Sequence, residues 1–169
     1  GEGSRHYQNL GGKLRRQTRS VQGGFEGNSE PENSLGACPP SLRLVVAMTG
    51  ASGVAYGKRL LEVLREKKVE THLVVSKAAE KVIEHELETS KKDLETLATH
   101  AYDVDDLAAP LMSGSFKTDG MVIVPCSMKT LAGIVHGFAD NLILRAADVA
   151  LKEKRRLVVV PRETPLSVV

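Results

Sequence analysis

Small, hydroxyl-bearing and charged residues follow each of four short apolar segments in this sequence. The four phrases are Thr49-Gly50-Ala51-Ser52-Gly53, Ser76-Lys77, Pro125-Cys126-Ser127-Met128-Lys129-Thr130 and Pro161-Arg162-Glu163-Thr164-Pro165. Glycine lets a backbone approach an anion closely, and a helix that starts after such a loop presents unpaired N–H groups. Hydroxyl groups donate further hydrogen bonds, and arginine binds phosphate with two N–H groups at once. The four phrases therefore predict a site for a phosphate group or a polar ring.

Each candidate also has a purely structural interpretation. The first phrase can be a tight strand–helix turn in which Ser52 caps the helix, and Arg162 and Glu163 can form a surface ion pair. Glu163 can instead transfer a proton during catalysis. No histidine is an obvious base for Cys126, so we expect an inert, packed thiol rather than a nucleophile. We expect Lys129 at the surface or at a contact between subunits.

Three well-known nucleotide-binding motifs are not matched. A P-loop needs Lys-Ser or Lys-Thr after its second glycine, whereas Gly57-Lys58-Arg59 has the wrong spacing and no hydroxyl group. The dinucleotide fingerprint, with three glycines at fixed spacing, does not occur. The first loop is like the start of the nucleotide loop of extended short-chain dehydrogenases, but Tyr56 stands where a glycine belongs. Ser76-Lys77 also lacks the acidic residue that binds the ribose of NAD.

The spacing of apolar residues predicts alternating strands and helices. We expect strands at 42–48, 71–75, 120–124 (ended by Pro125) and 157–160, the first, third and last of them apolar enough to be buried. Helices are expected at 54–67, 77–87, 94–98, 131–136 and 141–154. This alternation indicates an α/β fold of three layers, Rossmann-like or flavodoxin-like, around a parallel sheet. Ligands of such sheets bind at the carboxyl ends of the strands, where the four phrases lie.

The composition narrows the classes of partner. A net charge of +2 is too small to indicate nucleic acid or an acidic membrane, and 4% aromatic residues without Trp argue against a base-stacking surface. No apolar run approaches the ~20 residues that cross a bilayer. Cys38 and Cys126 form no Cys-x-x-Cys pair, so we expect neither a disulfide framework nor a structural zinc site. We therefore expect a reducing compartment, by default the cytoplasm.

We divide the chain into a disordered tail at residues 1–40 and a folded domain at 41–169. The tail contains eight of the 15 glycines and no apolar periodicity. Its basic stretch Lys13–Arg19 is either part of a segment that targets the protein to the mitochondrion or a solvated tail. The chain stops soon after the last expected strand, and we expect the C-terminal end of the domain to be missing.

Several phrases between Leu42 and Leu166 resemble, in order and spacing, the UbiX flavin prenyltransferase family. They are Met48-Thr49-Gly50-Ala51-Ser52-Gly53 with Tyr56-Gly57, Ser76-Lys77-Ala78-Ala79, Ser113-Gly114-Ser115, Pro125-Cys126-Ser127-Met128-Lys129-Thr130, Asp140-Asn141-Leu142, Arg145-Ala146-Ala147-Asp148-Val149, Leu151-Lys152-Glu153 and Pro161-Arg162-Glu163-Thr164-Pro165-Leu166. The resemblance implies a flavodoxin-like fold, usually assembled into a dodecamer. The implied activity joins a dimethylallyl group from dimethylallyl phosphate to N5 and C6 of reduced FMN, without a metal. The product, prenylated FMN, is the cofactor of UbiD-type decarboxylases.

The resemblance also assigns roles to individual residues. The positions implied to bind FMN are Gly50, Ala51, Ser52, Ser76, Ser127, Met128, Lys129, Thr130 and Arg162. Arg145, Lys152 and Ser52 correspond to residues near the prenyl phosphate, where cations and donors stabilise the charge of a leaving group. Glu86 and Glu163 correspond to acidic residues that handle protons.

The family continues beyond the last phrase with a helix, a strand, and a tyrosine and an arginine that bind the prenyl phosphate. A complete active site would therefore need sequence beyond Val169. Two other functions stay open. One is an FMN-dependent cysteine decarboxylase, although the early catalytic histidine and the Pro-x-Met-Asn-x-x-Met phrase of those enzymes are absent. The other is a non-catalytic flavin-binding fragment.

Overall fold

The structure, a computed structural model, describes residues 42–167. In chain order its elements are β1 (Arg43–Met48), α1 (Val54–Glu66), β2 (Glu70–Val75), α2 (Lys77–Leu87), α3 (Lys91–Glu95), β3 (His100–Tyr102), the short 3-10 helix η1 (Pro110–Met112), β4 (Gly120–Cys126), α4 (Met128–Val135), α5 (Leu142–Lys152) and β5 (Arg156–Pro161). The expected tail at 1–40, with its basic stretch Lys13–Arg19, lies outside the described residues. Within them, no helix is both long and apolar enough to cross a membrane.

The five strands form one parallel sheet in the order β3-β2-β1-β4-β5. Val46 in β1 lies between Leu73 of β2 and Val122 of β4, so these three strands end along the same edge. If the short edge strand β3 is left aside, the four longer strands follow the flavodoxin-like order second, first, third, fourth. The expected α/β class with a parallel sheet is confirmed.

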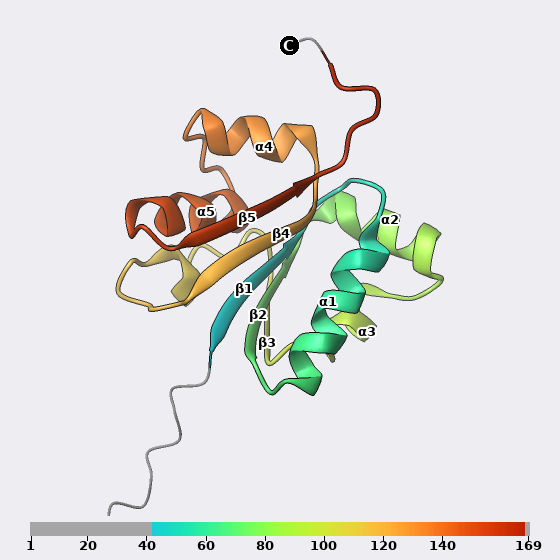
Figure 1. The fold of residues 1–169 in the computed structure, drawn as a ribbon, viewed down its shortest axis with the longest axis horizontal. Coiled ribbons are helices and arrows are strands. Elements are labelled where there is room, and N and C mark those ends of the chain that lie inside the picture. Colours follow the sequence, from blue (N-terminus) through green and yellow to red (C-terminus); the bar gives the residue numbers. More distant parts are fainter. Residues whose placement is uncertain (1–41, 168–169) are drawn as a thin grey trace, which may run out of the picture. The chain divides into compact units, whose positions relative to one another are not determined.

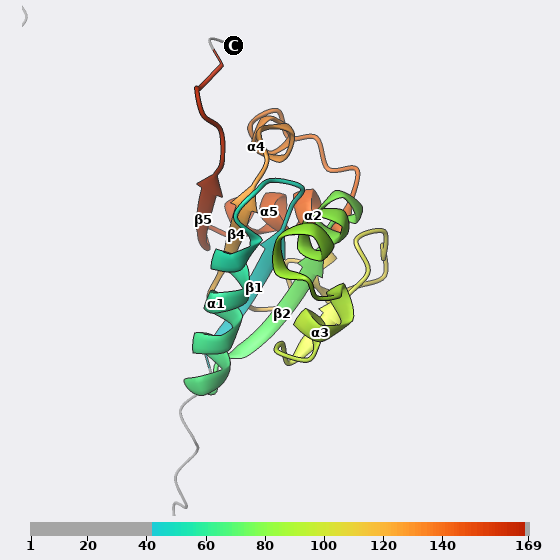
Figure 2. The same cartoon turned by 90° about the vertical axis from the view of Figure 1, so that its right-hand side faces the viewer.

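Helices cover both faces of the sheet, as Figure 1 shows, with α1, α2 and α3 on one side and α5 on the other. Figure 2 turns the sheet and shows β5 at its outer edge. The buried residues between the sheet and the first set of helices include Val46, Leu73, Leu61 and Ile83. Those beneath α5 include Val45, Ile123, Leu142 and Ala147. The strands thus alternate their side chains between two separate apolar clusters.

A glycine allows α1 to lie close to the strand ends. A Cβ atom at Gly57 would stand 2.6 Å from the carbonyl oxygen of Val124 and 2.7 Å from Cε of Met48. Both distances are too short for any side chain, so only glycine permits this approach. The close packing fixes the start of α1 beside the ends of β1 and β4.

Several elements differ from the expected ones. β4 continues through Pro125, which follows a cis peptide bond, to Cys126, because the pairing with β5 shifts register between Ile123 and Cys126 and leaves room for a residue without an N–H group. α4 begins at Met128 rather than at Leu131. β3 and η1 lie in a stretch whose apolar residues have no regular spacing.

β5 is exposed and not buried as its sequence predicts. Val158 is 50% exposed and Val160 is 42% exposed, while Leu157 and Val159 on the other face pack beneath α5. Within the described residues β5 pairs with β4 alone, so it forms an edge of the sheet. One face of this strand therefore presents apolar side chains to solvent in the isolated chain.

Candidate functional site

A cleft of about 450 Å³ opens at the carboxyl ends of the strands. Five of the residues that the sequence assigns to cofactor binding line it, namely Gly50, Ser76, Ser127, Lys129 and Thr130. Ala51, Ser52 and Met128 stand next to these residues in the chain but not in the wall itself. The first three of the four predicted loops therefore meet at one place, because parallel strands end at a common edge.

Thr49 joins two of these loops. Its side chain, 2% exposed, donates a hydrogen bond to the carbonyl oxygen of Pro125 (3.0 Å) and accepts one from the backbone N–H of Ser127 (2.7 Å). Its own N–H also donates to Pro125 (3.1 Å). Each polar group of this buried threonine thus has a partner, which fixes the loop after β1 against the loop after β4. The sequence interpretation did not give Thr49 this role.

Three helices begin at the cleft, each capped by a polar residue in its wall. The side chain of Ser76 accepts from Ala79 N (3.2 Å) at α2, Ser127 accepts from Thr130 N (3.3 Å) at α4, and Asn141 accepts from Leu144 N (3.1 Å) at α5. A serine that accepts such a bond keeps its O–H hydrogen as a donor. The positive ends of three helix dipoles and two hydroxyl groups therefore point toward one volume, an environment suited to an anion.

Glycine is required where the first loop crosses α2. A Cβ atom at Gly50 would stand 2.4 Å from Cβ of Ala78, closer than two carbon atoms can approach. The pair Gly50 and Ala78 thus brings the loop and the first turn of α2 together along the cleft. This arrangement leaves backbone, rather than side chains, at the surface that a ligand would meet.

Glu86 caps α1 from the neighbouring helix α2. Its Oε2 accepts hydrogen bonds from the N–H groups of Gly53 (2.9 Å) and Val54 (3.3 Å). Hydrogen bonds from the Ser52 hydroxyl and from Gly53 lower the pKa of Glu86, so the carboxylate is ionised at neutral pH. The interpretation of Ser52 as the helix cap is wrong. The N-cap residue of α1 is Gly53, at φ 99°, and glycine has no side chain that could cap the helix. Glu86 and Ser52, both assigned to catalysis, do lie together.

Arg162 and Glu163 follow β5 and are exposed. The backbone N–H of Arg162 donates to the carbonyl oxygen of Cys126 (3.0 Å), which ties the fourth loop to the third. Among residues 42–167, no ion pair joins the two side chains, so the interpretation as a surface ion pair is not supported. Neither side chain lines the cleft in this chain.

Arg145 and Lys152 lie on α5, away from the cleft wall. Arg145 forms an ion pair with Asp148 one turn later (3.0 Å), and Lys152 is exposed in the last turn. The helix rises ~1.5 Å per residue, which places Lys152 roughly 16 Å along its axis from Asn141 at the cleft. Arg155 donates to the carbonyl oxygen of Gly114 (2.6 Å), so the Ser113-Gly114-Ser115 loop also lies at this far end.

The sequence assigned no role to three other side chains in the wall. Lys77 and Asp105 form an ion pair, and the hydrogen bond to Asp105 raises the pKa of Lys77. Asp140 completes this polar part of the wall. Lys77 and Asp140 belong to phrases quoted from the sequence, whereas Asp105 lies in the stretch without regular apolar spacing.

Cys126 is an inert thiol. It is fully buried at the end of β4, and burial raises its pKa to about 11. At neutral pH it is therefore protonated and a poor nucleophile. The expectation of a packed cysteine is confirmed. Lys129, expected at the surface or a subunit contact, is exposed and lines the cleft.

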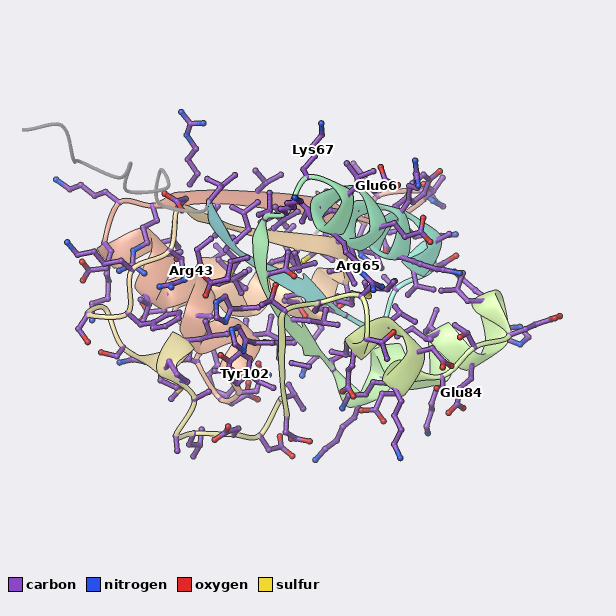
Figure 3. All side chains as sticks on the ribbon, turned by 90° about the horizontal axis from the view of Figure 1, so that it is seen from below. Arg43, Arg65, Glu66, Lys67, Glu84 and Tyr102 are labelled. Carbon is purple, nitrogen blue, oxygen red and sulfur yellow. The ribbon has the colours of Figure 1, made fainter. Side chains whose placement is uncertain are left out.

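A second, wider hollow of about 570 Å³ lies at the opposite end of the sheet. It is bordered by the end of α1 and the segment after α3, including Arg65 (labelled in Figure 3), Lys68, Thr96 and Thr99. None of the residues assigned from the sequence borders it. The cleft at the carboxyl ends, where the predicted loops converge, is the candidate site.

Comparison with known proteins shows the family to which the chain belongs. Residues 32–166 match the family model described as Flavoprotein. The chain is 60% identical over 127 residues to a probable UbiX-like flavin prenyltransferase of Streptomyces sp. (strain D7), an alignment that covers 75% of this chain and 64% of that protein. The chain thus spans just under two thirds of the length of this relative.

Two solved structures share both sequence and fold with the chain. The crystal structure of AnUbiX (PadA1) in complex with FMN and dimethylallyl pyrophosphate has a TM-score of 0.75 and 55% identity, covering 76% of this chain and 68% of that one. The dodecameric FMN-dependent UbiX-like decarboxylase from Escherichia coli O157:H7 has a TM-score of 0.74 and 56% identity, covering 75% and 70%. From the family model and from these relatives, the chain belongs to the flavoprotein family, in its UbiX flavin prenyltransferase branch.

Proposed function

We propose that this chain binds FMN in the cleft at the carboxyl ends of its strands, as the flavin-binding part of a flavin prenyltransferase. The observation that carries the proposal is the convergence of three helix starts, at Ser76, Ser127 and Asn141, on one cleft. A phosphate monoester is the ligand class that such a set of N–H groups and hydroxyls prefers. The solved relative that is 55% identical holds FMN together with dimethylallyl pyrophosphate.

The residues of the cleft fit FMN. Gly50, packed against Ala78, presents backbone to the cleft, and the hydroxyls of Ser76, Ser127 and Thr130 donate to phosphate or ring oxygens. Lys129 adds a positive charge at the rim, and Arg162 is assigned to the same ligand from the adjoining loop. When bound, reduced FMN supplies the electron-rich N5 and C6 positions that receive the dimethylallyl group.

Two acidic residues have separate tasks in this proposal. Glu86, held ionised by Ser52 and the start of α1, fixes the Ser52 hydroxyl at the edge of the cleft. When the dimethylallyl donor binds, the single O–H hydrogen of Ser52 turns from Glu86 to the phosphate and stabilises it as it leaves. Glu163 accepts the proton that ring closure on the flavin releases. The leaving phosphate carries away the electron pair of the broken C–O bond.

Arg145 and Lys152 serve the cleft of a neighbouring copy in a homo-oligomer. Neither side chain lines the cleft of its own chain, and Lys152 lies at the far end of α5 from it. Exposed Phe138, Leu151 and Val158 offer apolar surface for assembly. The related E. coli protein is dodecameric. A UbiD-type decarboxylase is the proposed recipient of prenylated FMN, and the cytoplasm the proposed location, or the mitochondrion if the basic stretch Lys13–Arg19 directs import.

Titration with FMN tests the proposal. Adding the purified chain to FMN should quench flavin fluorescence at a 1:1 ratio, whereas FAD and NAD should bind more weakly because the donors of the cleft suit a single phosphate monoester. Replacement of Ser127 by Ala, which removes both the α4 cap and a donor, should weaken binding. If a sample with native circular dichroism leaves the fluorescence of FMN unchanged, the proposal fails.

A further inference from the structure

A second cluster of polar side chains lies at the amino ends of β2 and β3, at the opposite end of the sheet from the cleft. It consists of Glu70, His72 and His100, whose nearest ligand-type atoms all lie within 4.8 Å of one another. Glu70 Oε1 is 3.1 Å from His72 Nε2 and 3.9 Å from His100 Nε2. The proposed prenyl transfer uses none of these groups.

The parallel sheet itself brings the three side chains together. Glu70 and His72 are two residues apart on β2 and so point to the same face. The register pairs His72 with His100 on β3, and their rings stack with centroids 4.8 Å apart. Backbone hydrogen bonds on two adjacent strands therefore fix the positions from which the groups project, and little ordering remains to be done when a ligand binds.

His72 is buried, and a hydrogen-bonding partner orients its ring. Its side chain is 2% exposed, and burial lowers its pKa, although Glu70 acts in the other direction. Its Nδ1 lies 2.9 Å from Tyr102 Oη, and this contact orients the ring with Nε2 toward Glu70. Metal-bound histidines generally have such a partner on their second nitrogen.

We propose that Glu70, His72 and His100 form a binding site for a divalent transition-metal ion, with Zn²⁺ as the best fit. Two imidazoles and one carboxylate are a common set of protein ligands for zinc. With bonds of ~2.0–2.2 Å in a tetrahedron, ligand atoms lie ~3.3–3.6 Å apart. The 3.1 Å separation lies just below this range, and rotation of the half-exposed His100 side chain would shorten the 3.9 Å separation. Water takes the fourth position on the exposed side.

Arg43 competes with a metal ion for the carboxylate of Glu70. Its Nε lies 2.9 Å from Oε1 of Glu70, yet the buried Nε makes no hydrogen bond of acceptable geometry. The guanidinium is held over the ring of Phe116 (4.8 Å), while Nη1 donates to the carbonyl oxygen of Lys117. Figure 3 shows Arg43 and Tyr102 on the same side of the sheet, from the strands on either side of β2. The positive charge opposes a bound cation, so its removal should favour the metal.

A competition titration of the chain, freed of any affinity tag, tests the site. Zn²⁺ is titrated against a chromogenic chelator, and Co²⁺ serves as a spectroscopic probe, because four-coordinate Co²⁺ absorbs strongly in the visible range. We expect one Zn²⁺ per chain and a visible Co²⁺ band. His100→Ala should abolish the band and weaken Zn²⁺ by more than the ~10–100-fold typical of losing an outer partner.

Two further variants separate the site from its neighbours. His85→Ala removes an exposed histidine on α2 and should leave the Zn²⁺ affinity unchanged, whereas Arg43→Gln should increase it. Circular dichroism confirms that each variant is folded. Equal Zn²⁺ affinity in His100→Ala and the parent chain, or binding weaker than millimolar in the parent, would overturn the proposal. The cluster would then be a hydrogen-bonded network of Glu70, His72 and Tyr102 alone.

Discussion

The two ends of the sheet carry opposite chemistry. At the carboxyl ends, the cleft is built from loops, and the groups that the helix starts present to it are donors, namely helix N–H groups and the hydroxyls of Ser76 and Ser127. At the amino ends, the cluster of Glu70, His72 and His100 is built from strand residues, and its functional groups are acceptors. The first suits an anion and the second a cation.

The polarity of a parallel α/β sheet explains this difference. Every helix that follows a strand begins at the carboxyl edge, so the positive ends of the dipoles gather there. The amino edge receives helix ends instead, and a site there depends on side chains that adjacent strands hold in register. Variants at the two ends should therefore act independently.

The largest effect is expected for Glu163→Gln. The substitution keeps size and hydrogen bonding but removes the basic carboxylate, so prenyl transfer should slow by about 10²–10⁴-fold while FMN binding stays intact. The rate of prenylated FMN formation is measured in the chain extended to the length of the Streptomyces relative. Unchanged turnover would remove Glu163 from the mechanism and leave Glu86 or the phosphate as proton acceptor.

Arg162→Ala should act mainly on FMN binding, in contrast to Glu163→Gln, which should act on turnover. Loss of a charge-assisted contact to FMN should weaken its affinity by roughly 1.5–3 kcal/mol, or about 10- to 150-fold. Flavin fluorescence measures this directly, and Zn²⁺ affinity at the other end serves as the internal control. If Arg162→Ala and Glu163→Gln weaken FMN equally, the two residues act as a structural pair and the assigned roles are wrong.

Thr49→Val should loosen the cleft without touching the ligand groups. Valine has nearly the same shape, but the N–H of Ser127 loses its acceptor in a buried place, which costs ~1–3 kcal/mol. Urea unfolding should show this loss of stability, and FMN affinity should fall because α4 is less well placed. Thr89→Val, which removes a hydroxyl whose hydrogen bond to Asp93 is exposed, provides the control. Equal stability of both variants would deny Thr49 its role as a link.

Sequence patterns predicted the carboxyl end of the sheet well, because its site follows strands with strong apolar signals. Gly50, Ser76 and Ser127 stand directly after such strands, and parallel pairing alone brings them together. Glu86 was named from the resemblance, but its position at the start of α1 depends on how α1 packs on α2, which no local pattern records. For the same reason the distance of Lys152 from the cleft became visible only in the structure.

The amino end could not be predicted in the same way. Glu70 and His72 have the two-residue spacing of one strand face, and that signal was present. His100 belongs to β3, a strand of three residues with exposed positions and little apolar character, so its pairing with β2 is decided by tertiary contacts. The prediction that β5 is buried was wrong for a different reason. An apolar run indicates that a strand tends to be buried, but it does not show that the same chain supplies the residues that bury it.

The smallest effect concerns pH and separates the two ends by the range in which each titrates. Burial lowers the pKa of His72 from 6.5, so below pH 6.5 the unfolded chain binds a proton that the folded chain does not. Stability therefore falls as pH drops from 6.5 toward the folded pKa, by at most about 1.4 kcal/mol per pH unit. Glu86 acts lower. Hydrogen bonds from Ser52 and Gly53 depress its pKa from 4.5, so its stabilisation is complete above pH 4.5 and is lost as pH falls through the folded value.

Urea midpoints between pH 3 and 8, with EDTA present to remove metal, distinguish the two groups. His72→Gln should flatten the curve only just below pH 6.5, and Glu86→Gln only below pH 4.5, with His85→Gln as the control for loss of an exposed imidazole. Because the groups lie at opposite ends of the sheet, the double variant should show the sum of the two changes. A Glu86→Gln curve that differs from the parent mainly near pH 6 would show that the two ends are coupled, against the separation that the sheet predicts.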